Sequence, residues 1–180
     1  MHIIQPTTLV DQAEFAGPLF FTAGPIQGGD DWQKRCCELL VQRAAAPVSI
    51  ACPCRYKEGH PLYEYRVTGE EERFERQTPW ERHYLTLASK VGCIIFWLPE
   101  ESKTKPRKGN RPYACGSRDE LGEWRGRLIY DRSIRLVIGA EARFPGLNPV
   151  VYSYREVCGN DFPIYSTLEE TVQAAIAKAF

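Results

Sequence analysis

Short apolar segments alternate along this chain with segments whose apolar residues recur at helical spacing. Such alternation predicts a parallel sheet with helices on both faces, because each parallel connection needs a crossover. Right-handed crossovers restrict the topology to a doubly wound arrangement of the flavodoxin or Rossmann type. We therefore expect one α/β domain over residues 1–180, with a parallel sheet of about five strands. The expected strands are residues 19–23, 48–52, 92–98, 134–138 and 150–154, and the expected helices begin near Asp31, Thr78, Ser117 and Ser166.

Composition excludes several classes of protein. Of the 180 residues, 43% are hydrophobic, which is enough for a continuous core. The chain has 23 Lys and Arg against 23 Asp and Glu, so it lacks the overall positive charge of a dedicated nucleic-acid binder. No stretch approaches the roughly 18 apolar residues of a membrane helix, and no secretory signal is recognisable. We expect a cytoplasmic protein that binds neither nucleic acid polymers nor membranes.

The seven cysteines do not show the paired Cys-x-x-Cys spacing of a structural zinc site. Cysteine in a reducing compartment most often serves as a small buried apolar residue. We therefore expect reduced thiols in the core and predict no metal site.

Two glutamates lie near expected helix starts. Glu81 follows Thr78 by three residues, and Glu120 follows Ser117 by three, so each pair matches a capping box. In that interpretation the glutamates only cap their helices. The alternative is catalytic, because both helix starts are expected at one edge of the sheet, where two carboxylates can face one substrate. A helix N-terminus would also favour the ionised carboxylate.

A glycine-containing turn, residues 24–29, follows the first expected strand. Its glycines allow a ligand to approach the backbone closely and to meet exposed amide donors. The turn matches neither the dinucleotide-binding fingerprint nor the phosphate-binding loop of nucleoside triphosphatases, so it does not predict NAD or ATP binding. An ordinary strand-to-helix turn explains these glycines equally well.

Two long polar segments interrupt the pattern, residues 55–76 and 100–116, and either is long enough to form a lid. The second is basic, and three interpretations of it remain open: it grips a phosphate, it closes a pocket, or it is simply solvated. Its basic residues are Lys103, Lys105, Arg107, Lys108 and Arg111.

Three motifs occur together in order and spacing: residues 21–26 (Phe-Thr-Ala-Gly-Pro-Ile), 77–81 (Gln-Thr-Pro-Trp-Glu) and 117–122 (Ser-Arg-Asp-Glu-Leu-Gly). With them the chain resembles the nucleoside 2-deoxyribosyltransferase family, most closely its branch with a Gln-x-x-Trp-Glu motif. The resemblance covers residues 19–139. It implies a doubly wound fold and an enzyme that moves 2-deoxyribose between bases through a covalent glutamyl intermediate.

The resemblance also implies roles for individual residues. Glu120 would attack the anomeric carbon, and Glu81 would be the helix-start acid that contacts base or sugar. Ser117 would line the sugar side, Gln77 would lie near the base, and the cavity floor would be formed by Gly24, Pro25 and Ile26. The substrates would be a small-molecule nucleoside and a nucleobase, no metal or organic cofactor is implied, and the protein would be a homo-oligomer, a dimer or larger.

The chain departs from the family at two positions besides the basic loop. The first strand carries Phe20 and Phe21, where well-known transferases have a tyrosine that steadies the nucleophile. Gln27 replaces an arginine of related deoxynucleotide hydrolases, which argues against a 5′-phosphate. Two alternatives therefore remain: a hydrolase of deoxynucleosides or their 5′-monophosphates, and a non-catalytic nucleotide-binding module of the same fold. His83 is a tempting general acid, but a lone histidine more often packs or faces solvent.

Overall fold

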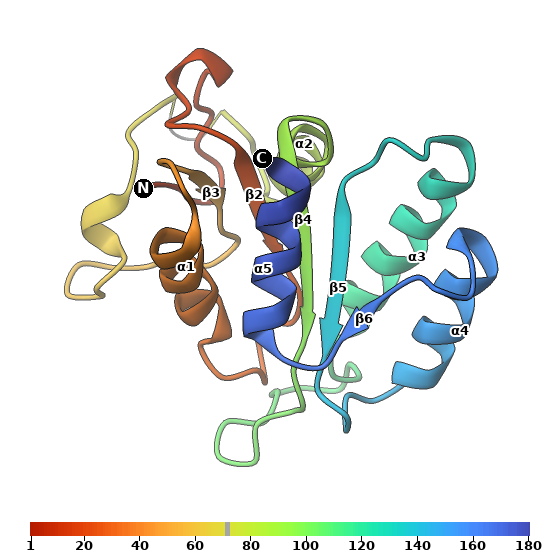
Figure 1. Cartoon of the computed structure of the whole chain (residues 1–180). Coiled ribbons are helices and arrows are strands. Elements are labelled where there is room, and N and C mark those ends of the chain that lie inside the picture. The colour runs from red at the N-terminus through yellow and green to blue at the C-terminus, as the bar shows by residue number, and fades with distance from the viewer. Residues whose placement is uncertain (71–72) are drawn as a thin grey trace.

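The computed structural model describes residues 1–70 and 73–180. Within these residues six parallel strands form one sheet in the order β1-β3-β2-β4-β5-β6, covered by five α-helices (Figure 1). The strands are β1 (His2–Ile4), β2 (Leu19–Ala23), β3 (Ser49–Ala51), β4 (Gly92–Leu98), β5 (Leu136–Ala140) and β6 (Ile164–Tyr165). The α-helices are α1 (Trp32–Arg43), α2 (Gln77–Val91), α3 (Cys115–Tyr130), α4 (Leu147–Cys158) and α5 (Leu168–Ala179), and two 3-10 helices are Gln12–Glu14 and Tyr63–Tyr65.

The sheet is doubly wound, as the sequence predicts. Helices α1 and α5 pack on one face, and α2, α3 and α4 pack on the other (Figure 1). Apart from the edge strand β1, the order β3-β2-β4-β5-β6 is that of flavodoxin-like folds. The order reverses between β2 and β4, and ligands in such folds bind beyond the carboxyl ends of the strands at this switch point.

The expected strands at 19–23, 48–52, 92–98 and 134–138 correspond to β2, β3, β4 and β5, with bounds that differ by up to two residues. The expected strand at 150–154 is wrong, because these residues lie within α4. A short apolar run is ambiguous between strand and buried helix, and here Tyr154 decides it by donating a hydrogen bond to the Leu121 carbonyl at 2.8 Å. The sequence reading missed β1 and β6, which have three and two residues.

Both predicted capping boxes near the glutamates are wrong. Helix α2 begins at Gln77 and α3 at Cys115, and neither has a side-chain cap. In α3 the preceding Ala114 adopts a left-handed conformation with φ 56°, and the helix begins at Cys115, two residues before the predicted start near Ser117. The carboxyl groups of Glu81 and Glu120 are therefore not used as caps.

The C-terminal helix begins with a capping box. The Thr167 side chain accepts a hydrogen bond from the Glu170 amide, and the Glu170 carboxylate accepts one from the Thr167 amide. This pair satisfies two amides that would otherwise lack partners, and it starts α5 where the sequence predicts a helix.

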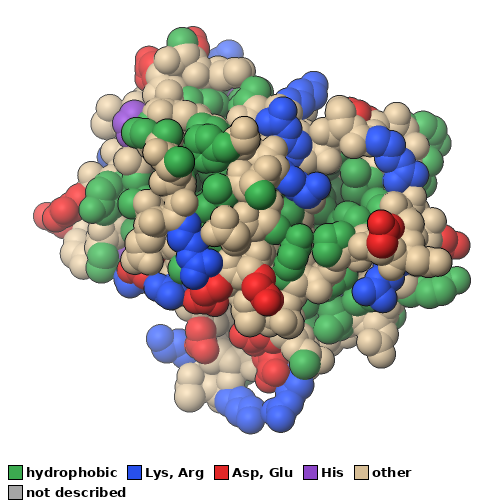
Figure 2. Space-filling model, viewed as in Figure 1, with side chains coloured by type: hydrophobic (Ala, Val, Ile, Leu, Met, Phe, Trp, Pro, Cys, Tyr) green, Lys and Arg blue, Asp and Glu red, His purple; other side chains and the backbone are tan. Residues whose placement is uncertain are grey.

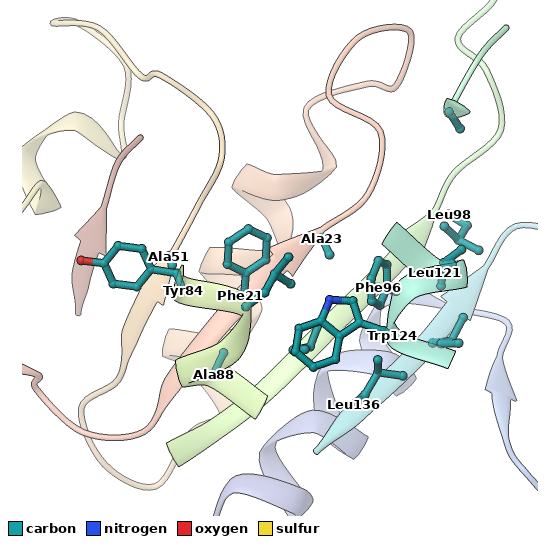
Figure 3. Close-up of a cluster of buried hydrophobic side chains, with 14 of the residues drawn as sticks. Phe21, Ala23, Ala51, Tyr84, Ala88, Phe96, Leu98, Leu121, Trp124 and Leu136 are labelled. Carbon is teal, nitrogen blue, oxygen red and sulfur yellow. The ribbon is translucent and has the colours of Figure 1, made fainter. Parts of the chain in front are cut away.

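The core on the α2 and α3 face supports the beginning of α2. Side chains from these two helices meet those of β2, β4 and β5 there (Figure 3). Trp80 is fully buried against Phe21 and Tyr84, and its Nε1 donates to the Thr8 carbonyl at 3.0 Å. Tyr84 donates to the same carbonyl at 3.2 Å and accepts from the Val10 amide at 2.9 Å. The N-terminal segment is thereby held on α2 beside Glu81.

All seven cysteines are free thiols, and four of them are fully buried, as expected for cysteine used in a core. Cys54, Cys115 and Cys158 are only partly buried, so the expectation holds for part of the set. No helix in the described residues is long and apolar enough to cross a membrane.

Replacing Trp80 with alanine should lower the free energy of unfolding by about 3–5 kcal/mol, because it leaves a cavity under α2 and removes one of two donors to Thr8. Trp80→Phe should cost less, since the aromatic packing is kept. Urea unfolding followed by circular dichroism measures both changes. Tyr130→Ala is the control, because Tyr130 is 91% exposed and should change stability by no more than about 0.5 kcal/mol. Equal losses in the Trp80 and Tyr130 variants would contradict this account of the core.

Candidate active site

A cavity of about 770 Å³ lies at the carboxyl end of β2, on the face covered by α2 and α3. All seven residues that the sequence singled out line it: Gly24, Pro25, Ile26, Gln77, Glu81, Ser117 and Glu120. They come from three segments far apart in the chain, the turn after β2 and the first turns of α2 and α3. The switch point of the sheet brings these segments together.

The turn after β2 forms one wall. Gly24 has φ +148°, and a Cβ there would lie 2.2 Å from the carbonyl oxygen of Trp97, so no other residue fits without a backbone shift. The Pro25 carbonyl accepts a hydrogen bond from Trp32 Nε1 at 2.8 Å, which ties the turn to α1. Ile26, in the same turn, lines the cavity and is 41% exposed.

Glu81 and Gln77 form a bonded pair on α2. Gln77 Nε2 donates to Glu81 Oε1 at 2.8 Å and to the Pro53 carbonyl at 3.1 Å, so the amide fixes the carboxylate relative to the segment after β3. Burial raises the pKa of Glu81, and the hydrogen bond from Gln77 partly offsets this effect. Gln77 therefore orients Glu81 and favours its ionised form.

Glu120 has the most perturbed carboxyl group in the cavity. Burial raises its pKa to about 8, and the neighbouring charges of Glu81, Glu123 and Asp119 contribute in the same direction. The expectation that a helix N-terminus favours the ionised form is not met, because Glu120 is the sixth residue of α3 and lies beyond the first turn. Near neutral pH the cavity thus holds a carboxyl group that retains its proton.

Several residues of the wall were not identified as site residues from the sequence. Arg107 and Arg111 come from the basic loop, whose role the sequence left open. Tyr56 comes from the polar segment after β3, where it stacks on His60 with ring centroids 4.0 Å apart and donates to Asp31 at 3.3 Å. No periodicity marks such positions, because contacts with distant segments place them. The remaining lining residues are Phe21, Ala23, Gln27, Pro53, Cys54, Arg55, Thr78, Ala114, Cys115 and Gly116.

Other polar candidates lie outside the cavity. Glu123, three residues after Glu120, pairs with Arg127 at 2.7 Å. His83 packs between Phe74 and Tyr84, and burial lowers its pKa, which suits a packing role. The second polar segment, residues 55–76, was predicted as a loop and contains the 3-10 helix Tyr63–Tyr65; its residues 71–72 lie outside the described residues.

A scan of the sequence against protein-family models and a search of curated proteins find no match. In the part of the chain that is described, no group of three or more His, Cys, Asp or Glu side chains could hold a metal ion. What the protein does is therefore inferred from the chemistry of the cavity and from the resemblance of its motifs.

Glu120→Gln should stabilise the protein in a pH-dependent way. The folded protein holds the Glu120 proton up to about pH 8, whereas an exposed carboxyl loses it near 4.5, so the wild type loses stability as pH rises between these values. The glutamine variant avoids this loss, and at pH 8 its Tm should exceed that of the wild type by about 2–4 °C for each kcal/mol gained.

Thermal unfolding of both proteins at pH 4.5 and pH 8 tests this expectation. The difference in Tm should be smallest at the lower pH. Glu156→Gln on α4 is the control, since that side chain is exposed and is not one of the charges that raise the pKa of Glu120. A difference that stays constant between the two pH values would mean that Glu120 titrates normally.

Proposed function

We propose that this protein cleaves the N-glycosidic bond of a 2′-deoxynucleoside and transfers the sugar to an acceptor base. One observation carries the proposal: Glu81 and Glu120, from two different helices, line one cavity at the switch point of the sheet. Among the described residues neither carboxyl group is paired with a cation. Retaining glycosidases also use a pair of carboxyl groups for displacement at an anomeric carbon.

Glu120 retains its own proton near neutral pH, so the reactive form is the one in which that proton has passed to Glu81. In the first step the ionised Glu120 then attacks C1′ of the sugar, and a C1′–O bond forms. The C1′–N bond breaks, and its electron pair goes to the leaving base. The base must gain a proton as it departs, and Glu81 in its protonated form is placed to give it. The raised pKa of Glu81 suits this role, because the carboxyl keeps a proton at higher pH than an exposed glutamate does.

In the second step an acceptor base attacks C1′ from the face that the first base left. The C1′–O bond breaks, Glu120 is released as a carboxylate, and the proton lost by the acceptor returns to Glu81. Two inversions give net retention at C1′, as in retaining glycosidases. If water attacks instead, the same intermediate gives hydrolysis, which is the first alternative interpretation of the sequence.

The remaining walls of the cavity agree with a small polar substrate. Its volume of about 770 Å³ falls within the roughly 300–1,000 Å³ of small-molecule sites. Gln77 presents an amide beside Glu81, where it can meet the edge of a base, and Gly24 lets the sugar approach the backbone. By resemblance to the family we also propose a homo-oligomer that acts in the cytoplasm without a cofactor.

Glu120→Gln should abolish formation of new deoxynucleoside, because the amide cannot form the sugar ester. We expect a loss on the order of 10³-fold or more. Purified protein is incubated with each 2′-deoxynucleoside, with and without adenine as acceptor, and the products are separated by chromatography. Glu123→Gln, on the same helix but outside the cavity, should retain activity.

The products distinguish the alternatives. New deoxynucleoside that requires the acceptor supports transfer, and free base without acceptor dependence identifies a hydrolase. Activity that survives Glu120→Gln would show that another group is the nucleophile. A protein that is stabilised by nucleosides but releases no base would be the binding module.

The rate should fall above about pH 8, by about tenfold per unit, because the two carboxyl groups then lose the proton that the leaving base must receive. Glu123→Gln should move this limb to lower pH, since removing a neighbouring negative charge lowers the pKa of Glu120. Initial rates of base release between pH 5 and pH 9 measure both effects. A rate that still rises between pH 8 and pH 9 would contradict the roles given to Glu81 and Glu120.

A further inference from the structure

The basic loop between β4 and α3 is built into the site. Its Ser102 is buried, and the Ser102 amide donates to the Gly28 carbonyl at 2.6 Å. Tyr113 at the other end is also buried and donates to the Pro99 carbonyl at 3.0 Å. A Cβ on Gly28 would meet the Arg107 amide at 2.9 Å, so the loop lies directly against the turn after β2. Figure 1 shows it below the carboxyl ends of the strands.

The five basic residues of this loop divide into two groups. The three lysines and Arg111 are exposed and Arg107 is half-buried, but only the two arginines line the cavity. The lysines are Lys103, Lys105 and Lys108. Figure 2 shows basic and acidic side chains close together at the lower end of the molecule, where the loop lies. A guanidinium group can form two parallel hydrogen bonds with a phosphate or carboxylate, so two arginines in the cavity wall point to contact with an anion.

Arg107 is held in place before any ligand binds. Its Nη1 donates to the Pro112 carbonyl at 2.6 Å and contacts Cys115 Sγ at 3.3 Å. In the described part of the chain, neither Arg107 nor Arg111 forms an ion pair with a carboxylate. The cavity therefore contains two guanidinium groups that form no ion pair with a described side chain.

The beginning of α3 adds neutral donors to the same wall. Ser117 is 7% exposed and lines the cavity, and its hydroxyl makes no hydrogen bond with any described residue. Helix α3 has no side-chain cap, so the amides of its first turn also lack a partner from a capping side chain. Two cations, the hydroxyl of a buried serine and an uncapped helix N-terminus together form a typical site for a phosphate.

We infer that Arg107, Arg111 and Ser117 bind a phosphate monoester, so that the preferred substrate is a 2′-deoxynucleoside 5′-monophosphate. This inference rests on the proposed function and refines its substrate. Gln77 and Glu81 come from α2, whereas the phosphate donors come from α3 and the loop before it. Glu120 lies on α3 as well, which places the sugar between the base side and the phosphate side. Gln27 supplies no charge, and the loop arginines replace it.

A phosphate monoester matches this wall better than a neutral 5′-hydroxyl does. It carries a charge of about −1.5 to −2 near neutral pH and three strong acceptor oxygens, enough for two arginines and a serine. A 5′-hydroxyl would leave both guanidinium groups without an anion. The protein should therefore discriminate between a 2′-deoxynucleoside and its 5′-monophosphate, which differ only in the phosphate.

The test compares each 2′-deoxynucleoside with its 5′-monophosphate in the wild type and in Arg111→Gln, with Lys108→Gln as the control on the same loop. In the wild type we expect kcat/KM for base release to be higher for the monophosphate. Arg111→Gln should lower it by about 10- to 100-fold for the monophosphate and leave the nucleoside nearly unchanged. Arg111→Lys should restore part of the loss, and Lys108→Gln should change neither substrate.

A wild type that prefers the nucleoside, or an Arg111→Gln variant that loses both substrates equally, would overturn the inference and leave the proposed function standing. If neither compound releases a base, the proposed function fails, and binding decides the inference. Thermal shift with 2′-deoxyadenosine 5′-monophosphate, 2′-deoxyadenosine and inorganic phosphate then provides the readout. Stabilisation by the monophosphate in the wild type and Lys108→Gln, but not in Arg111→Gln, supports the phosphate site; equal shifts in all three proteins, or none, overturn it.

Discussion

The site exists because the connections that follow the adjacent strands β2 and β4 run to opposite faces of the sheet. Helix α1 follows β2 on one face, and α3 follows β4 on the other. Nothing in the sheet covers the point where these connections part, so a crevice remains there. Gly24 makes this geometry possible, because the turn after β2 passes so close to the Trp97 carbonyl that a side chain would not fit. Every other wall of the cavity is arranged around that turn.

Within the crevice, the electrostatic environment of Glu120 makes the folded protein less stable but gives the carboxyl group an unusual pKa that catalysis can use. Burial and three neighbouring carboxylates raise the pKa of Glu120 to about 8, which means that ionising it in the folded protein costs free energy. A stable fold would avoid such a cluster or pair it with cations. Strained or destabilised groups of this kind are concentrated at functional sites and are tolerated because the surrounding core is strong. Here the buried contacts of Trp80 and Tyr84 under α2 provide that support.

Much of the fold follows from local patterns. The strands β2, β3, β4 and β5 are short and largely apolar, and β2 and β4 are also bounded by Gly or Pro, so their existence could be predicted from the sequence. The helix at residues 150–154 could not be predicted in this way, because an apolar run of that length is compatible with a strand or a helix. Contact with α3 selects the helix. The seven site residues could be placed at one edge because strand and helix order already fixes which segments meet there. Their proposed roles come from the resemblance of the motifs.

By itself the sequence determined the doubly wound α/β fold and the segments that line its carboxyl edge, since periodicity and chain order depend on local interactions. Tertiary structure decided the helix starts, which freed Glu81 and Glu120 from capping, because a left-handed Ala114 and packing under α2 outweigh local capping signals. It also decided that Arg107 and Arg111 face the cavity while the loop lysines do not. That outcome depends on hydrogen bonds such as Ser102 to Gly28, between residues far apart in the chain, which no local pattern encodes.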